Sequence, residues 1–273
     1  MEMNDQNSTS PEDSPFIMSF EDSADRVPVL WLHGFPLNNT MWDYQISGLT
    51  DIARLVTPDL RGHGLSEPTE VTTYSMEMLA TDCANLLDHL GYEGPVVLAG
   101  LSMGGYLAFE ICRRYPERVA GLILASTKAT PDSDEVKAAR NKTIEVVQAD
   151  GVESTVEGLL PKLLAPSAYE ENPDLVEFLQ DMMMATSAAG LAGAAAAMRD
   201  RPDSTPDLAG LAVPTLIIHG EEDQLIPYAE AQAMAASIPD AELVIVPGAG
   251  HMPNMEQPDV FNDAVRDFLE SFY

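Results

Sequence analysis

The chain has 273 residues, of which 45% are apolar and 21% charged, and 44 acidic residues against 14 basic ones give a formal net charge of −30. This composition excludes a wholly disordered or fibrous chain, and the negative field argues against binding to nucleic acid or an anionic membrane. No apolar stretch reaches the roughly 18 residues needed to span a bilayer, and no positively charged start precedes an apolar run. We therefore expect a globular, cytoplasmic protein.

Short apolar runs and helical patterns alternate along most of the chain. Residues 1–14 are polar and acidic, and they predict a disordered tail. Runs rich in leucine and β-branched residues then recur at 27–32, 53–57, 95–100, 120–126, 214–220 and 242–248. They do not alternate with polar residues, as expected of parallel strands covered on both faces. With helical patterns at 75–90, 103–115 and 257–272, this order predicts an α/β protein with a mostly parallel, doubly wound sheet.

One interval, about 128–207, breaks the alternation because no strand is predicted in it. Helical patterns cover 134–149, 152–164 and 173–198. We interpret residues 128–207 as a helical cap, inserted after the sixth strand and lying over the sheet edge where ligands bind. Residues 15–127 and 208–273 form the predicted core.

Sulfur-containing side chains fall within several of these helical patterns. Cys83 and Cys112 are expected to pack in the core as small apolar groups. The methionine run 182–184 and the alanine-rich sequence 190–200 fit either core packing or an adaptable pocket lining.

A serine between glycines follows the run 95–100. Residues 100–104, Gly-Leu-Ser-Met-Gly, match the nucleophile elbow G-x-S-x-G and lie between a predicted strand and a predicted helix, as that motif requires. The glycines leave room for a strained turn and for a substrate beside the serine. The spacing predicts Ser102 as a catalytic nucleophile; the alternative is a glycine-rich turn with an ordinary capping serine.

A serine hydroxyl is a poor nucleophile near neutral pH and needs an adjacent base. Among five histidines, His251 follows the last predicted strand, on a loop that returns to the elbow's edge of the sheet. His89 lies within a helical pattern and His219 at the end of a strand, where structural roles suit them better. We therefore predict His251 as the base.

The acid that orients the base is expected after one of the late strands. No carboxylate directly follows the run 120–126, whereas Glu221, Glu222 and Asp223 follow the run 214–220. Asp223 lies on the turn before the next helix, and the order Ser, Asp, His matches this kind of triad. Asp223 is the predicted acid, with Glu222 as the alternative.

The negative oxygen that develops during acyl transfer needs backbone N–H donors. One is expected from Met103, directly after the nucleophile, and the other from the loop 33–36 after the first run. Pro36 has no N–H to donate, so Phe35 is the predicted second donor.

The loop 59–64, Asp-Leu-Arg-Gly-His-Gly, invites a metal or phosphate interpretation. One histidine among glycines lacks the ligand count of a metal site, and the phosphate and dinucleotide glycine motifs are absent. We expect a rigid loop with internal hydrogen bonds, and chemistry without a metal or a cofactor.

Five motifs run in order through the chain: L-H-G-F-P at 32–36, D-L-R-G-H-G-L-S at 59–66, G-L-S-M-G-G at 100–105, H-G-E-E-D at 219–223 and P-G-A-G-H at 247–251. Together they resemble the α/β-hydrolase family over about residues 27–272. The sequence A-A-M-R-D-R-P-D-S-T-P, followed by V-P-T-L-I-I-H-G, is similar to bacterial carboxylesterases labelled as related to 3-oxoadipate enol-lactonases. The resemblance implies hydrolysis of a small ester or lactone under a helical cap.

Two classes of function fit these residues. In the first, a serine hydrolase, Ser102 attacks, His251 takes and returns the proton, and Asp223 steadies the imidazolium. In the second, the same fold is a ligand-binding sensor with little turnover that signals through its cap. Perhydrolase or cofactor-free haloperoxidase side activity, thioester cleavage and carbon–carbon hydrolysis begin with the same geometry and stay open. Hydrolysis is the function we predict.

Overall fold

The computed structural model describes residues 16–23, 26–68 and 73–272. Seven strands in these residues form one sheet: β1 (Phe20–Asp22), β2 (Val27–Leu32), β3 (Ala53–Pro58), β4 (Val96–Leu101), β5 (Val119–Ala125), β6 (Thr215–Gly220) and β7 (Glu242–Val246). Their order is β1-β3-β2-β4-β5-β6-β7, and all neighbours are parallel except β1 and β3. The mostly parallel sheet is confirmed, and β2 to β7 arise from the six predicted runs. The predicted tail, 1–14, lies outside the described residues.

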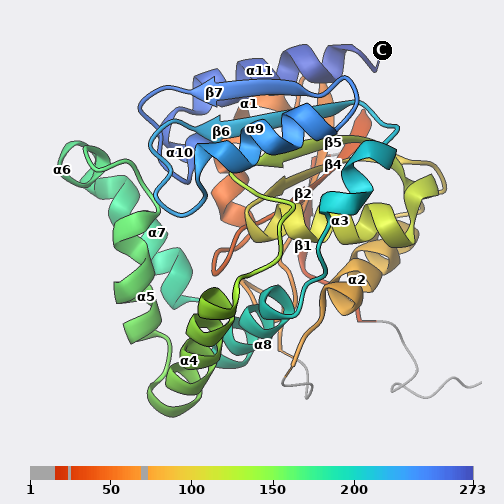
Figure 1. Cartoon of the computed structure of the whole chain (residues 1–273). Helices are drawn as coiled ribbons and strands as arrows, with labels where there is room; N and C mark the ends of the chain where they lie inside the picture. Colours follow the sequence, from red (N-terminus) through yellow and green to blue (C-terminus); the bar gives the residue numbers. More distant parts are fainter. Residues whose placement is uncertain (1–15, 24–25, 69–72, 273) are drawn as a thin grey trace, which may run out of the picture.

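Helices cover both faces of the sheet (Figure 1). On one face α2 (Met76–His89), α3 (Met103–Arg114) and α9 (Tyr228–Ser237) pack on side chains such as Leu30 and Leu98. On the other, α11 (Pro258–Glu270) packs on side chains such as Trp31 and Val97. Successive strand residues thus enter opposite apolar layers, which explains why the strands are apolar without alternation.

Shorter helices complete the chain. They are η2 (Asn39–Trp42), α1 (Asp43–Leu49), η3 (Pro116–Arg118), η4 (Leu160–Lys162), η5 (Thr205–Gly210) and α10 (Pro253–Glu256). Ser75 caps α2 by accepting a hydrogen bond from the Met78 amide at 3.1 Å, and Gly91 follows the helix with a φ of 74°. Both helix-end residues act as the sequence predicts.

Five α-helices lie between β5 and β6, and we call them the cap helices: α4 (Asp134–Asp150), α5 (Glu153–Leu159), α6 (Ala168–Glu171), α7 (Pro173–Met184) and α8 (Ala188–Arg199). They project beyond the sheet in Figure 1. The predicted position after the sixth strand is wrong, because they follow β5, the fifth strand of the described residues. Only the short antiparallel strand β1 precedes β2 there.

The predicted helix 173–198 is interrupted between α7 and α8. The buried Thr186 hydroxyl donates to the Pro36 carbonyl at 2.8 Å. Ser187 Oγ accepts from the Gly190 amide, capping α8, and donates to the Gly62 carbonyl at 2.9 Å. These bonds fasten the cap helices to two loops of the core, and that attachment ends α7 although its apolar pattern continues.

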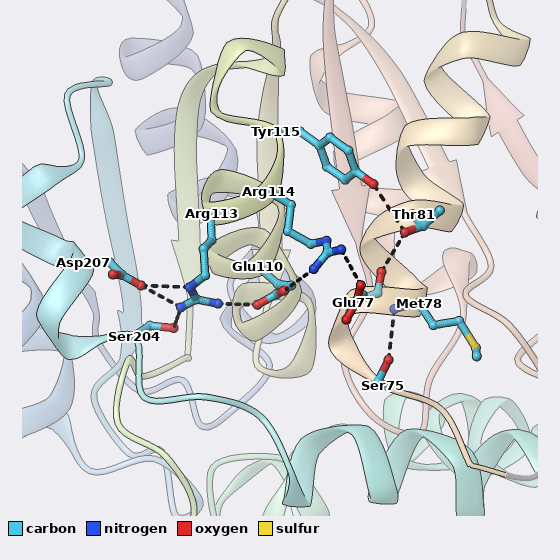
Figure 2. A network of polar contacts seen from close by, with 10 residues as sticks. All are labelled: Ser75, Glu77, Met78, Thr81, Glu110, Arg113, Arg114, Tyr115, Ser204 and Asp207. Carbon is cyan, nitrogen blue, oxygen red and sulfur yellow. Dashed lines mark hydrogen bonds and ion pairs between the residues drawn. The ribbon is translucent and has the colours of Figure 1, made fainter.

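An ion-pair network ties the segment after the cap to the core (Figure 2). Arg113 of α3 contacts Asp207 of η5 at 2.7 Å and pairs with Glu110 one turn earlier. Arg114 pairs with Glu77 of α2. The network therefore holds α2, α3 and η5 together.

The predicted core packing of both cysteines is confirmed. Cys83 is buried in the apolar layer of α2 and α3, the half-buried Cys112 packs against it, and both thiols are free. Burial raises the pKa of the Cys112 thiol to about 12. Among the described residues, no helix is long and apolar enough to cross a membrane.

Candidate active site

Ser102 lies on a strained turn between β4 and α3. Its φ of 54° and ψ of −109° belong to a region that residues with a side chain rarely occupy. A Cβ on Gly104 would lie 2.0 Å from the Leu32 carbonyl oxygen, and one on Gly100 would lie 2.3 Å from the Gly104 carbonyl oxygen. The two glycines of the motif are therefore needed for the close approach of β2, β4 and α3 at this turn.

His251 and Asp223 are directly joined. His251 Nδ1 lies 2.8 Å from Asp223 Oδ2, and Asp223 Oδ1 accepts hydrogen bonds from the amides of Leu225 at 2.8 Å and Ile226 at 3.0 Å. Burial opposes ionisation of Asp223, but the charge and hydrogen bond of His251 and the two amide donors outweigh it and lower the pKa of Asp223. An ionised carboxylate only accepts hydrogen bonds, so His251 donates through Nδ1 and leaves Nε2 free to act as a base.

Ser102 and His251 line the same cavity of about 250 Å³, but no hydrogen bond between them is recorded in the described part of the chain. The structure thus joins two of the three predicted triad residues and brings the third to the same cavity. The alternative acid, Glu222, is exposed to solvent.

The loop that carries His251 is attached to the cap. The His251 amide donates to the Leu163 carbonyl at 3.0 Å. The carboxylate of Glu256 accepts from the amides of Gly250 at 2.8 Å, Met252 at 3.3 Å and Ala165 at 2.7 Å. Sequence reasoning missed Glu256; the available signal was a carboxylate five residues after the histidine.

The two predicted oxyanion donors lie beside the nucleophile. Phe35 lines the cavity, and Met103 is the first residue of α3, where a backbone N–H has no partner within the helix. In the described residues neither amide donates to a protein acceptor. The loop of Phe35 is held by the Leu37 amide, which donates to the Gly34 carbonyl at 2.9 Å. Both amides are therefore available to a ligand oxygen.

The loop 59–66 has the internal hydrogen bonds expected of it. Asp59 accepts from the amides of Asn39 and Leu65, both at 2.8 Å, and Ser66 Oγ donates to the Asp59 carbonyl at 2.7 Å. His63 is buried against His33, with ring centroids 5.0 Å apart. No group of three or more His, Cys, Asp or Glu side chains suited to a metal ion occurs in the chain as described.

The other histidines make contacts that fit structural roles. His219 is buried, and its Nε2 lies 3.0 Å from the Ile226 carbonyl oxygen, to which it donates, and 3.8 Å from Asp223 Oδ2. His89 is exposed, with its ring edge-on to Phe20.

The cap supplies a large part of the cavity wall. Val136, Ala139 and Arg140 of α4 line it, and so does Met198 of α8. The run 182–184 instead packs in the core, where Met182 and Met183 are buried. The alanine-rich sequence 190–200 thus contributes both to core packing and to the cavity lining, the two possibilities that the sequence left open.

Charged side chains of the cavity were also missed by sequence reasoning. Lys128 and Asp132 lie on the segment after β5, and Arg140 lies on α4. They belong to no catalytic motif, so only the folded arrangement reveals them.

Comparison with known proteins places these observations in context. A family model described as alpha/beta hydrolase fold matches residues 27–258. A solved structure of a thermophilic esterase from Thermogutta terrifontis, with malate bound, has a TM-score of 0.91 and 43% identity over 93% of each chain. The chain is 30% identical to 3-oxoadipate enol-lactonase 2 of Acinetobacter baylyi over 91% of each chain. It is 28% identical to a non-heme haloperoxidase of Rhodococcus erythropolis, over 92% of this chain and 95% of the relative.

Proposed function

Because the chain belongs to the α/β-hydrolase family, we propose that it is a serine hydrolase that cleaves small carboxylic esters or lactones through an acyl-enzyme. The observation that supports this most directly is the cavity shared by the strained Ser102 and by His251, whose Nδ1 is hydrogen-bonded at 2.8 Å to Asp223, a residue with a buried side chain. The esterase and enol-lactonase relatives support the same reaction class.

The reaction follows from the roles of these groups. Ser102 Oγ attacks the ester carbonyl while His251 Nε2 takes its proton, and the carboxylate of Asp223 stabilises the resulting imidazolium. The amides of Phe35 and Met103 donate to the oxyanion. The imidazolium returns the proton to the alcohol as it leaves, and an acyl-enzyme remains. Water then attacks the acyl carbon with His251 as base, and the acid is released with Ser102 restored.

The proposed substrate is small. The cavity of about 250 Å³ is below the roughly 300–1,000 Å³ of pockets for drug-sized ligands. Every step above uses groups of the chain, so the proposal needs no cofactor. It also includes no nucleic acid or membrane partner, in keeping with the net charge of −30.

The haloperoxidase relative favours a second candidate activity on the same acyl-enzyme. Hydrogen peroxide in place of water would attack the acyl carbon and release a peracid. Peracid formation from acetate and hydrogen peroxide, compared with ester hydrolysis by the same preparation, measures which activity dominates.

The test uses p-nitrophenyl acetate and p-nitrophenyl butyrate with the wild type and Ser102→Ala. A rapid burst of p-nitrophenol followed by steady turnover is expected, and Ser102→Ala is expected to lower turnover on the order of a million-fold. Ordinary turnover by Ser102→Ala would disprove the mechanism. Binding of an ester without multiple turnover, together with ligand-dependent association with another protein, would instead support the sensor.

A further inference from the structure

Lys128 stands out among the charges of the cavity. The chain has 14 basic residues against 44 acidic ones, and only four of the basic residues are lysines. Lys128 is half-buried and lines the cavity together with Ser102 and His251. Within the described residues it makes no hydrogen bond or ion pair. Partial burial removes some of the hydration of a lysine side chain, and an anionic ligand bound beside the ammonium group offsets that loss.

Asp132, the carboxylate among the residues that line the cavity, is already paired with other cations. Asp132 Oδ1 lies 2.7 Å from Arg201 Nη1, and Asp132 Oδ2 lies 3.0 Å from Arg140 Nε. Arg201 is held further by the Met198 and Thr130 carbonyls, at 2.8 and 2.9 Å. Asp132 is therefore fixed as the partner of two arginines and is not free to pair with Lys128.

The remaining neighbours of Lys128 do not neutralise its positive charge through an ion pair in the described residues. Glu230 attracts it without forming an ion pair, and both oxygens of Glu230 accept from the Thr130 hydroxyl at 3.2 Å. Burial, and then the charge of Arg201, lower the pKa of Lys128. An anion bound beside Lys128 would raise its pKa again and so offset both effects.

Arg140 offers a second donor on the same wall. It contacts Asp132 through Nε, and its two terminal nitrogens have no acceptor in the described part of the chain. Its side chain is only 21% exposed. A guanidinium fork suits a planar carboxylate, and a lysine beside it adds a point charge.

Lys128 is also connected to Ser102 through the residue that precedes it in the chain. It follows Thr127, whose Oγ1 donates to the Ser102 carbonyl at 2.8 Å. Because Lys128 and Ser102 line the same cavity, one small molecule can place an anion at Lys128 and its carbonyl at Ser102. Binding energy from such a remote group fixes the position of the reacting carbonyl.

We propose that Lys128 and Arg140 form a carboxylate-binding subsite, and that the substrate is a short ester bearing a free carboxylate, such as a monoester of a dicarboxylic acid. The inference rests on the proposed ester hydrolysis and adds its substrate class. Lys128 is the specificity-determining residue of this subsite.

Turnover is measured with the monomethyl esters of succinate, glutarate and adipate, each against the neutral ester in which an amide replaces the carboxylate. The wild type is expected to prefer the acids. Lys128→Met should lower kcat/KM for at least one acid by about 10- to 100-fold. The kcat/KM for the matching amide should stay within about two-fold of the wild-type value. Lys128→Arg should restore part of the loss. Equal effects on acid and amide, or no effect for all three lengths, would overturn the subsite.

The matched control is Lys142→Met, which removes the same charge from a side chain that is 73% exposed. It changes the net charge as much as Lys128→Met does but removes no donor from the cavity, so every ratio of acid to amide should stay close to that of the wild type. If it lowers the ratios as Lys128→Met does, general attraction rather than a subsite explains the preference, and the proposal fails.

Calorimetric binding of the same monoesters to Ser102→Ala separates this inference from the proposed function. Binding that weakens about 10-fold in Ser102→Ala/Lys128→Met supports the subsite whether or not any ester is turned over. Turnover of p-nitrophenyl acetate without such binding would leave the hydrolase proposal intact and refute the subsite. Binding dependent on Lys128 without turnover of any ester would do the reverse.

Discussion

The charge of Asp223 fixes the tautomer of His251. One carboxylate oxygen accepts from the amides of Leu225 and Ile226, and the other faces His251 Nδ1. In Asp223→Asn the amide oxygen stays with the backbone donors, so the NH₂ group faces Nδ1 and favours the tautomer with its proton on Nε2. We expect kcat for p-nitrophenyl acetate to fall by about 10⁴-fold.

Glu222→Gln is the control for that substitution. Glu222 is the adjacent carboxylate and is exposed, so kcat should stay within about two-fold of the wild type, as for a surface change away from the site. If the glutamine variant lost activity and the asparagine variant kept it, the acid would be Glu222, the alternative left open by the sequence.

The paired histidines His33 and His63 make stability sensitive to mild acid. Burial lowers their pKa values from 6.5 to about 4 and about 3. As the pH falls through 6.5 the unfolded chain binds protons that the folded chain does not. The free energy of unfolding should therefore fall by about 1.4 kcal/mol per histidine per pH unit, until the pH nears the folded pKa values.

Urea unfolding at about pH 7.5, 6.5 and 5.5 measures this slope. His63→Gln removes one of the two groups, so its slope should be less steep by up to about 1.4 kcal/mol per pH unit. His219, whose pKa is also lowered by burial, contributes equally to both proteins. Carboxyl groups with raised pKa values, such as Asp59 and Asp82, titrate in both proteins and largely cancel in the comparison. Equal slopes would show that His63 is not held neutral by folding.

Residues whose positions in the chain are dictated by the reaction were the most predictable part of the site. Ser102, Asp223 and His251 follow strands at spacings that the reaction itself dictates, and the structure brings them to one cavity or bonds them directly. Lys128 and Glu256 have no such spacing. Only folding places Lys128 in the cavity wall and brings Glu256 to the amide of Ala165 on the cap segment.

At the scale of elements, Glu256 couples the histidine loop to the cap. In Glu256→Gln an NH₂ group replaces one carboxylate oxygen and faces an amide donor, either that of Ala165 or those of Gly250 and Met252. One side of the attachment is then lost, and His251 is less firmly held. We expect kcat to fall by about 10- to 100-fold, with a smaller effect on KM.

A stability-matched control shows whether that loss arises from position rather than from weaker folding. Arg113→Ala breaks the network of Figure 2 and leaves the buried Glu110 without its closest partner. It should cost about 1–3 kcal/mol while leaving kcat unchanged well below the melting temperature. Equal kcat losses at equal destabilisation would remove the positioning role of Glu256.

Elements were predictable where local pattern and packing agree. The strands β2 to β7 and the helix α2 arise from runs whose apolar spacing is also their buried face. The break between α7 and α8 was missed, because Thr186 and Ser187 find their partners, Pro36 and Gly62, more than a hundred residues earlier. The strand β1 was missed because it is short and includes the exposed Glu21.

At the scale of the whole molecule, charge is distributed unevenly. The net charge is −30, yet the cavity wall carries Lys128 and Arg140. An acidic surface repels anionic ligands at long range, while donors inside a cavity act at contact distance. Moderate salt would therefore aid the arrival of an anionic substrate by screening the surface.

The same net charge predicts that salt stabilises the fold. The 14 cations cannot neutralise 44 carboxylates, so screening should remove more repulsion than attraction. Between about 0.05 and 1 M NaCl, Tm should rise by about 2–4 °C for each kcal/mol of repulsion removed. A variant with the exposed residues Glu93, Glu157, Glu177 and Glu222 changed to glutamine should rise less. A Tm and an activity that fall as salt increases from low values would contradict this account of the acidic surface.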